Sequence, residues 1–219
     1  MIKACIFDLD GTLCNTLDSI AYFCNQTLKQ LGYSNIPTDK YRSLVGNGAE
    51  QLIHNMFHIV HPTYIPEDVH TAKQMFMDLY QENPLKCVTL YDGILPLLYT
   101  LKSNGILLAI LSNKPHVLTR LSVPKLFGEH LFDIWYGQRD EIPRKPAPDG
   151  ALMIAKELSV QPSQCLFIGD SDVDMHTGNS AGMKTAGVLW GYRSREELLH
   201  AGAQMIASTP SDIQNFIFQ

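Results

Sequence analysis

Short runs of apolar residues recur along the chain and are separated by segments with helical periodicity. The runs are almost wholly apolar, which is typical of strands buried on both faces of a sheet. They cover residues 4–7, 106–111, 165–169 and 184–190, with weaker candidates at 133–136 and 204–207. Helical patterns lie between them, as at 94–105, which ends on Gly105, and at 148–158, which begins with Pro148. This alternation predicts an α/β fold, a doubly wound parallel sheet with a Rossmann-like core.

One stretch, residues 16–86, breaks the alternation because it contains no convincing strand. Its apolar positions follow helical spacing instead, most clearly in residues 17–32. Since this stretch begins shortly after the first strand, it predicts a helical insertion placed over the site at the strand ends. We therefore expect an α/β core made of residues 1–14 and 87–219, and an inserted helical cap domain made of residues 15–86.

Composition narrows the classes of function. The 219 residues are 45% hydrophobic, which suffices for a sizeable core in one domain or in a domain with an insertion. The net charge of -5 and the lack of a Lys or Arg run argue against a nucleic-acid partner, and no apolar stretch approaches the ~20 residues that span a bilayer. The start of the chain lacks the regions of a signal peptide, and its five cysteines show no CxxC spacing. We expect a reduced, cytoplasmic protein without a membrane partner; the sequence predicts no oligomeric state.

Polar residues that can carry chemistry follow the ends of the predicted strands. Asp8 and Asp10 come directly after the first strand, and residues two apart point to the same side of an extended chain. Two like charges about 4 Å apart repel by roughly 4 kcal/mol at an effective dielectric near 20, so a cation or a shared proton is expected between them. The later strand ends add Ser112, Asn113 and Lys114, then Lys145 of RKPAPD, and finally Asp170, Asp172 and Asp174 of GDSDVDM.

These groups are expected to converge, because the ligand of such a sheet lies beyond the carboxyl ends of its strands. An acidic, oxygen-rich cluster suits Mg²⁺, which binds one or two carboxylates together with a substrate phosphate. Mg²⁺ and Lys145 would neutralise a phosphoryl group, while Ser112 and backbone N–H groups after Asp8 would bind its remaining oxygens. One carboxylate can then attack phosphorus and form an aspartyl phosphate, and the other can protonate the leaving oxygen and later activate water.

Four motifs in this order resemble those of the haloacid dehalogenase-like hydrolase superfamily. They are DLDGT (8–12), LSN (111–113), the lysine of KPAP (145–148) and GDSDVD (169–174). The resemblance implies that Asp8 is the nucleophile and Asp10 the general acid and base. It implies a Mg²⁺ site made of Asp8, the backbone carbonyl of Asp10, and Asp170. The residues expected to bind the substrate are Gly11, Thr12, Ser112, Asn113 and Lys145.

The remaining aspartates of GDSDVD carry less definite expectations. By the same resemblance Asp174 would position Lys145 or reach the metal through water, and Asp172 matches a variable position. One departure from the superfamily pattern is Asn15-Thr16, which stands where Asp-Ser is common; both residues can still cap the helix that follows.

The expected cap contains the stretch LVGNGAEQLI (44–53), which looks like that of phosphoglycolate phosphatases, where a VGNGA run faces the active site. Asp10 argues against the haloacid dehalogenase and phosphonoacetaldehyde hydrolase branches, and no arginine stands near Ala49, as it would in a β-phosphoglucomutase-like cap. The resemblance favours a phosphatase of small phosphorylated metabolites, with phosphoglycolate as the leading substrate. Arg42, near this stretch, could meet a substrate carboxylate or be solvated.

Other functions stay open at this point. A pyrophosphatase and a broad sugar- or nucleotide-phosphate phosphatase would share the four motifs, because these bind only the phosphoryl group. A receiver-like signalling module is a remote alternative, since it is about half this size and has no cap. A non-catalytic phosphate-binding protein is another, although the intact Asp8 and Asp10 pair argues against it.

Overall fold

The structure is a computed structural model that describes residues 1–219. Its largest element is a six-stranded sheet in the order β5-β4-β1-β6-β7-β8, in which every neighbouring pair is parallel. The strands are β1 (Ala4–Phe7), β4 (Leu107–Pro115), β5 (Ile134–Gln138), β6 (Cys165–Gly169), β7 (Lys184–Val188) and β8 (Met205–Ala207). The prediction of an α/β fold with a parallel sheet is confirmed, and each predicted run overlaps one strand.

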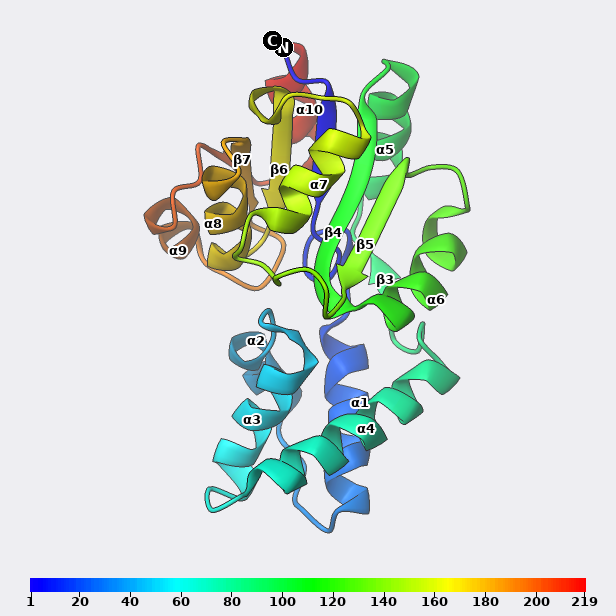
Figure 1. The fold of residues 1–219 in the computed structure, drawn as a ribbon, viewed down its shortest axis with the longest axis vertical. Helices are drawn as coiled ribbons and strands as arrows, with labels where there is room; N and C mark the ends of the chain where they lie inside the picture. Colours follow the sequence, from blue (N-terminus) through cyan, green and yellow to red (C-terminus); the bar gives the residue numbers. More distant parts are fainter.

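Helices cover both faces of this sheet (Figure 1). They are α5 (Ile94–Ser103), α6 (His116–Phe127), α7 (Asp149–Glu157), α8 (Asp172–Ser180), α9 (Arg195–His200) and α10 (Pro210–Phe218), with a 3₁₀ turn at Pro162–Gln164. Alternate residues of β1 explain why two layers form. Cys5 and Phe7 pack in one apolar cluster with α5 and α10, whereas Ala4 and Ile6 pack in another with α7. The sheet is therefore doubly wound.

Residues 16–86 contain helices and no strand. They are α1 (Leu17–Gln30), a 3₁₀ turn at Thr38–Lys40, α2 (Tyr41–Leu44), α3 (Gly48–Val60) and α4 (Pro66–Glu82). These helices bury an apolar cluster of their own, and Figure 1 shows them beyond the carboxyl ends of the sheet strands. Leu118 of α6 belongs to this helical cluster, so the two parts share an apolar contact.

A two-stranded antiparallel ribbon, β2 (Cys14–Asn15) with β3 (Thr89–Leu90), lies where the chain enters and leaves this helical part. The sequence did not predict it, because two-residue strands carry no measurable periodicity. The exact division into a core and a cap at residues 14/15 and 86/87 stays a prediction. None of the helices has both the length and the apolar character needed to cross a lipid bilayer.

The second long strand extends further than the apolar run predicted. β4 continues from Leu107 to Pro115 because its pairing with β5 resumes at Pro115 after an irregularity that begins at Leu111. Ser112 and Asn113 therefore lie within the last part of a strand and not after it. They fall in the irregular part of β4, between the paired residues Leu111 and Pro115.

Candidate active site

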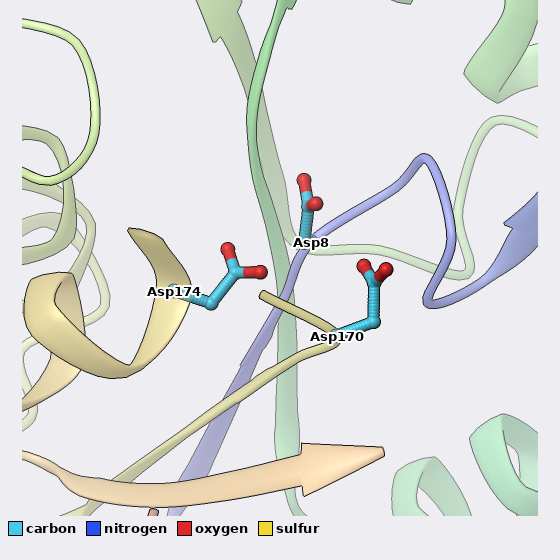
Figure 2. Close-up of side chains that lie close together, drawn as sticks. All are labelled: Asp8, Asp170 and Asp174. Atoms are coloured by element: carbon cyan, nitrogen blue, oxygen red, sulfur yellow. The ribbon is translucent and has the colours of Figure 1, made fainter. Parts of the chain in front are cut away.

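Three carboxylates meet at the carboxyl ends of β1 and β6. Asp8 directly follows β1, Asp170 directly follows β6, and Asp174 lies in the first turn of α8. Figure 2 shows them close together, and one oxygen from each lies within 4.8 Å of the others. All three are buried. Buried carboxylates at this spacing need positive charge nearby to be ionised together.

Lys145 supplies part of that charge. Its Nζ donates to Asp174 Oδ1 at 2.6 Å and forms an ion pair with Asp8 Oδ1 at 2.9 Å. Burial alone would lower the pKa of Lys145, but Asp174 and Asp8 outweigh burial and raise it. The other Asp174 oxygen accepts hydrogen bonds from the N–H and Oγ of Ser171. Asp174 is thus fully occupied by protein groups and holds Lys145 against Asp8.

The positive charge of Lys145 alone does not neutralise the three carboxylates. Burial raises the pKa of Asp8 to about 7, although Lys145 acts in the opposite direction. Burial also raises the pKa of Asp170 to about 8, and the negative charges of Asp174 and Asp8 add to the effect. Each Asp170 oxygen accepts only one hydrogen bond, and Asp8 Oδ1 has no donor beyond its ion-pair partner Lys145. Carboxylate oxygens with such remaining capacity are hard ligands that fit a small divalent cation such as Mg²⁺. The residues present therefore fit the metal that the sequence predicted.

The turn after β1 is built around Asp170. Gly11 has φ +91°, and a Cβ at this position would overlap the Asp170 carboxylate. Thr12 Oγ1 donates to Asp170 Oδ1 at 3.1 Å, and Tyr192 N–H donates to Asp170 Oδ2 at 2.8 Å. Gly11 and Thr12 were predicted to bind the substrate. In the structure Thr12 donates to Asp170 and Gly11 leaves room for its carboxylate, so both help to place that group.

Ser112 and Asn113 lie at the end of β4 but differ in what they contact. Ser112 Oγ accepts only a long hydrogen bond, 3.3 Å, from Lys114 N–H, and it lines the pocket. The Asn113 amide donates to the carbonyls of Gly46 and Lys145 and accepts from Lys145 N–H, each at 3.0 Å. The Asn113 side chain therefore connects three chain segments, and Ser112 is the freer of the two to meet a ligand.

Asp10 has a cationic partner of its own, which the sequence analysis did not anticipate. Lys114 Nζ lies 3.2 Å from Asp10 Oδ1 and 2.8 Å from Tyr80 OH, and it is buried. Burial would lower the pKa of Lys114, but Asp10 and Tyr80 raise it. The expected sharing of one cation by Asp8 and Asp10 stays a prediction, and the structure adds two lysines, Lys145 beside Asp8 and Lys114 beside Asp10. Each aspartate has a separate lysine.

Sequence reasoning therefore missed several residues that shape the site. Lys114 was noted at a strand end without a role, although a lysine next to a buried strand is rarely buried unless it is paired. Tyr80 lay inside a predicted helix and carried no signal. Tyr192 and Arg193 follow β7, and their position after a strand end was the only available indication.

A pocket that is partly open to solvent joins these groups to the helical part. From the sheet side it is lined by Asp8, Asp10, Ser112, Asn113, Lys114, Asp170, Ser171, Tyr192 and Arg193, among others. From the helical side it is lined by Val45, Gly46, Gly48 and Ala49 together with the apolar residues Ile20, Leu52, Phe76 and Tyr80. The VGNGA run thus faces the carboxylate cluster, as the resemblance implied. Arg42 does not line the pocket; its Nη1 donates to Gly191 O at 3.2 Å.

Comparisons with known proteins agree with this geometry. A model of the haloacid dehalogenase-like hydrolase family matches residues 5–188. The phosphoglycolate phosphatase of Aquifex aeolicus is 33% identical over 191 residues, which are 87% of this chain and 86% of that protein. The N-acetylmuramic acid 6-phosphate phosphatase of Pseudomonas aeruginosa is 30% identical over 221 residues, which are 97% of this chain and 93% of that protein.

Solved structures show the same arrangement over nearly the whole chain. The crystal structure of a predicted phosphoglycolate phosphatase from Haemophilus somnus has a TM-score of 0.91 at 27% identity and covers 98% of this chain and 97% of its own. That of CbbY from Rhodobacter sphaeroides in complex with phosphate has a TM-score of 0.78 at 26% identity and covers 97% and 96%.

Proposed function

Because this chain belongs to the haloacid dehalogenase-like hydrolases and is a phosphoric monoester hydrolase, we propose that it is a Mg²⁺-dependent phosphatase that forms an aspartyl phosphate on Asp8. The observation that carries this proposal is the placement of Asp8. Its carboxylate is buried at the end of β1, in contact with Lys145 and within reach of Asp170. A carboxylate held next to a fixed ammonium is suited to attack a phosphoryl group whose oxygens that ammonium neutralises.

In this proposal each residue has a defined role. Asp8 attacks phosphorus, and Lys145 and Ser112 bind the phosphoryl oxygens. Asp10 protonates the leaving oxygen and then takes a proton from the water that hydrolyses the aspartyl phosphate. Asp174 positions Lys145 through their 2.6 Å contact.

The metal site in this proposal consists of Asp8, the backbone carbonyl of Asp10, and Asp170. When bound, Mg²⁺ would neutralise charge on the phosphoryl group and on the carboxylates that surround it. Thr12 and the N–H of Tyr192 orient the Asp170 carboxylate for this task. Gly11 leaves the space that the carboxylate fills.

The leading substrate is 2-phosphoglycolate. Its support is the VGNGA run on the pocket wall and the relatives that carry this name. Gly46 has φ +115° and Gly48 has φ +83°, conformations that side chains rarely adopt. Glycine at both positions lets the backbone of the helical part come close to a small ligand, and residues 15–86 would thereby select the substrate.

A second candidate is a sugar phosphate. The N-acetylmuramic acid 6-phosphate phosphatase is similar to this chain at nearly the same identity as the phosphoglycolate phosphatases. The apolar wall of the pocket, which includes Ile20, Leu52 and Phe76, would suit the carbon skeleton of a larger substrate.

A screen of kcat/KM in Mg²⁺ tests both candidates. The substrates are 2-phosphoglycolate, N-acetylmuramic acid 6-phosphate, glucose 6-phosphate, pyrophosphate and a nucleoside monophosphate, with Asp8→Asn as the inactive control. We expect 2-phosphoglycolate to have the highest value. If either sugar phosphate has a higher kcat/KM, a sugar phosphate becomes the leading substrate. If none of the compounds releases phosphate in an Asp8-dependent way, the proposed phosphatase mechanism is wrong.

A further inference from the structure

Arg193 belongs to the loop after β7, yet its side chain reaches the helical part across the pocket. The segment before it is packed against Asp170, because Tyr192 N–H bonds to that carboxylate and a Cβ at Gly191 would overlap it. From this anchor the guanidinium extends to residues 42–45. Its Nη2 donates to Val45 O at 3.1 Å, and its Nη1 donates to Arg42 O. Arg193 directly follows Tyr192, which contacts the proposed metal ligand Asp170, and Arg193 lines the same pocket as Asp170.

Arg193 forms no ion pair in the protein; Glu197, whose pKa is lowered by hydrogen bonds with Ser194 and to a smaller extent by the charge of Arg193, lies beyond ion-pair distance. Two cations line the pocket, Lys114 and Arg193, and Lys114 is paired with Asp10. Lys145, which contacts Asp8, is paired with that carboxylate and with Asp174. Arg193 has no carboxylate within ion-pair distance and donates only to backbone carbonyls, which carry no formal charge. An unpaired, partly buried guanidinium on the wall of a binding pocket attracts an anion.

Its geometry also suits recognition of a carboxylate. Two of the five N–H groups of the guanidinium bond to Val45 and Arg42, which holds its plane in place. The other three N–H groups remain for a ligand, and a fixed guanidinium loses little conformational freedom on binding.

We propose that Arg193 binds a second anionic group on the substrate, a carboxylate in the leading case, and thereby selects small phosphomonoesters that carry two negative groups. This inference rests on the proposed function, because it assumes that the phosphoryl group lies at Asp8. It places a further determinant of specificity on the α/β core, in addition to the glycines of the helical part.

The test compares two substrates that differ only in this group. Ethyl phosphate has a methyl group where 2-phosphoglycolate has its carboxylate, so the ratio of their kcat/KM values measures recognition of the carboxylate. Arg193→Met should lower this ratio about 100-fold, and Arg193→Lys should lower it by only about 10-fold, since the charge remains without the planar fork.

Arg144→Met is the matched control. Arg144 Nη1 donates at 3.0 Å to Asn47 O, in the same loop of the helical part, but Arg144 does not line the pocket. Its replacement should leave the ratio unchanged. Turnover of ethyl phosphate in each variant reports whether the fold survives. If Arg193→Met lowers both activities by the same factor, or lowers neither, Arg193 is only a contact between the two parts and the inference is wrong.

Failure of the proposed substrate would give a different result. If the wild-type protein hydrolyses 2-phosphoglycolate no faster than ethyl phosphate, the substrate assignment falls, and a second pair, 3-phosphoglycerate and glycerol 3-phosphate, decides the role of Arg193. A preference for the acid that Arg193→Met abolishes supports the inference. No preference, or a preference that survives in Arg193→Met, overturns it.

Discussion

Lys114 Nζ lies 3.2 Å from Asp10 Oδ1 and at the same time donates to Tyr80 OH at 2.8 Å, so one buried ammonium connects the proposed general acid and base to helix α4. Tyr80 is itself held in place, since its ring stacks on Phe23 at a centroid distance of 4.5 Å and its OH accepts a hydrogen bond from Ser19. The orientation of Asp10 therefore depends on where the helical part lies relative to the sheet.

Replacement of Lys114 tests this dependence. Lys114→Met keeps much of the side-chain volume but leaves Asp10 without its ion partner. We expect kcat to fall about 100-fold, because a misplaced acid and base group loses much of its effect even when the substrate still binds. Steady-state kinetics with 2-phosphoglycolate measures this, and a melting curve checks the fold. Wild-type kcat in Lys114→Met would show that Asp10 needs no positioning.

Tyr80→Phe isolates the contribution of the helical part. The ring and its stacking on Phe23 remain, and only the hydroxyl that accepts from Lys114 and Ser19 is lost. We expect kcat to fall by up to about 10-fold, since a single hydrogen bond contributes about 1 kcal/mol net. A loss as large as that of Lys114→Met would mean that Tyr80, and not the ion pair, dominates the orientation of Asp10.

Replacement of Asp8 and replacement of Asp10 should block different steps of the reaction. Asp8→Asn removes the nucleophile, so no phosphoenzyme forms. Asp10→Asn keeps the nucleophile but lacks the base that activates water, so an aspartyl phosphate formed from acetyl phosphate should accumulate. Rapid quench with labelled acetyl phosphate, followed by counting of label that survives acid and is released by base, distinguishes the variants. Label retained on Asp8→Asn would exclude Asp8 as the nucleophile.

Removal of the metal should abolish turnover. With excess EDTA the buried carboxylates would repel a phosphate dianion, and addition of Mg²⁺ should restore activity. Calcium should support little turnover, because its larger and more flexible coordination would misplace Asp8 relative to phosphorus. Full activity in EDTA would contradict the proposed metal dependence.

Stability of the metal-free protein should depend on pH through the same carboxylates. Burial raises the pKa of Asp8 to about 7 and that of Asp170 to about 8, both above the ordinary value of 3.8. A carboxyl group whose pKa is raised in the folded state binds its proton more tightly there. Its contribution is therefore complete below about pH 4 and is lost as the pH rises through 7 to 8.

Melting temperatures in EDTA should consequently fall between pH 5.5 and 8.5, and Mg²⁺ should raise them more at pH 8.5 than at pH 5.5, because its ligands bind as carboxylates. Asp170→Asn is the matched control, since it removes one of the titrating groups and should show a smaller fall in EDTA. An equal fall in both proteins would mean that other groups cause the pH dependence.

Much of the fold could be predicted because its signals are local. The buried strands β1 and β6 are continuous apolar runs, and helices α1 and α5 repeat apolar residues at helical spacing. In a parallel sheet this pattern alone places the residues after each strand at one edge. The meeting of Asp8 with Asp170 and Lys145 followed from that rule without knowledge of any distance.

The partners of individual charges required the tertiary structure. Asp10 and Lys114 are 104 residues apart in the chain, and neither hydrophobic pattern nor motif indicates that they pair. The same holds for Asn113, whose amide bonds to Gly46 and Lys145, and for Arg193, which crosses to Val45. Periodicity reports which face of an element is buried, whereas an ion pair depends on which elements lie side by side and how far their side chains reach. The sequence by itself determined the sheet, the helical insertion and the set of reactive groups; packing of the helical part on the sheet decided which of these groups contact one another.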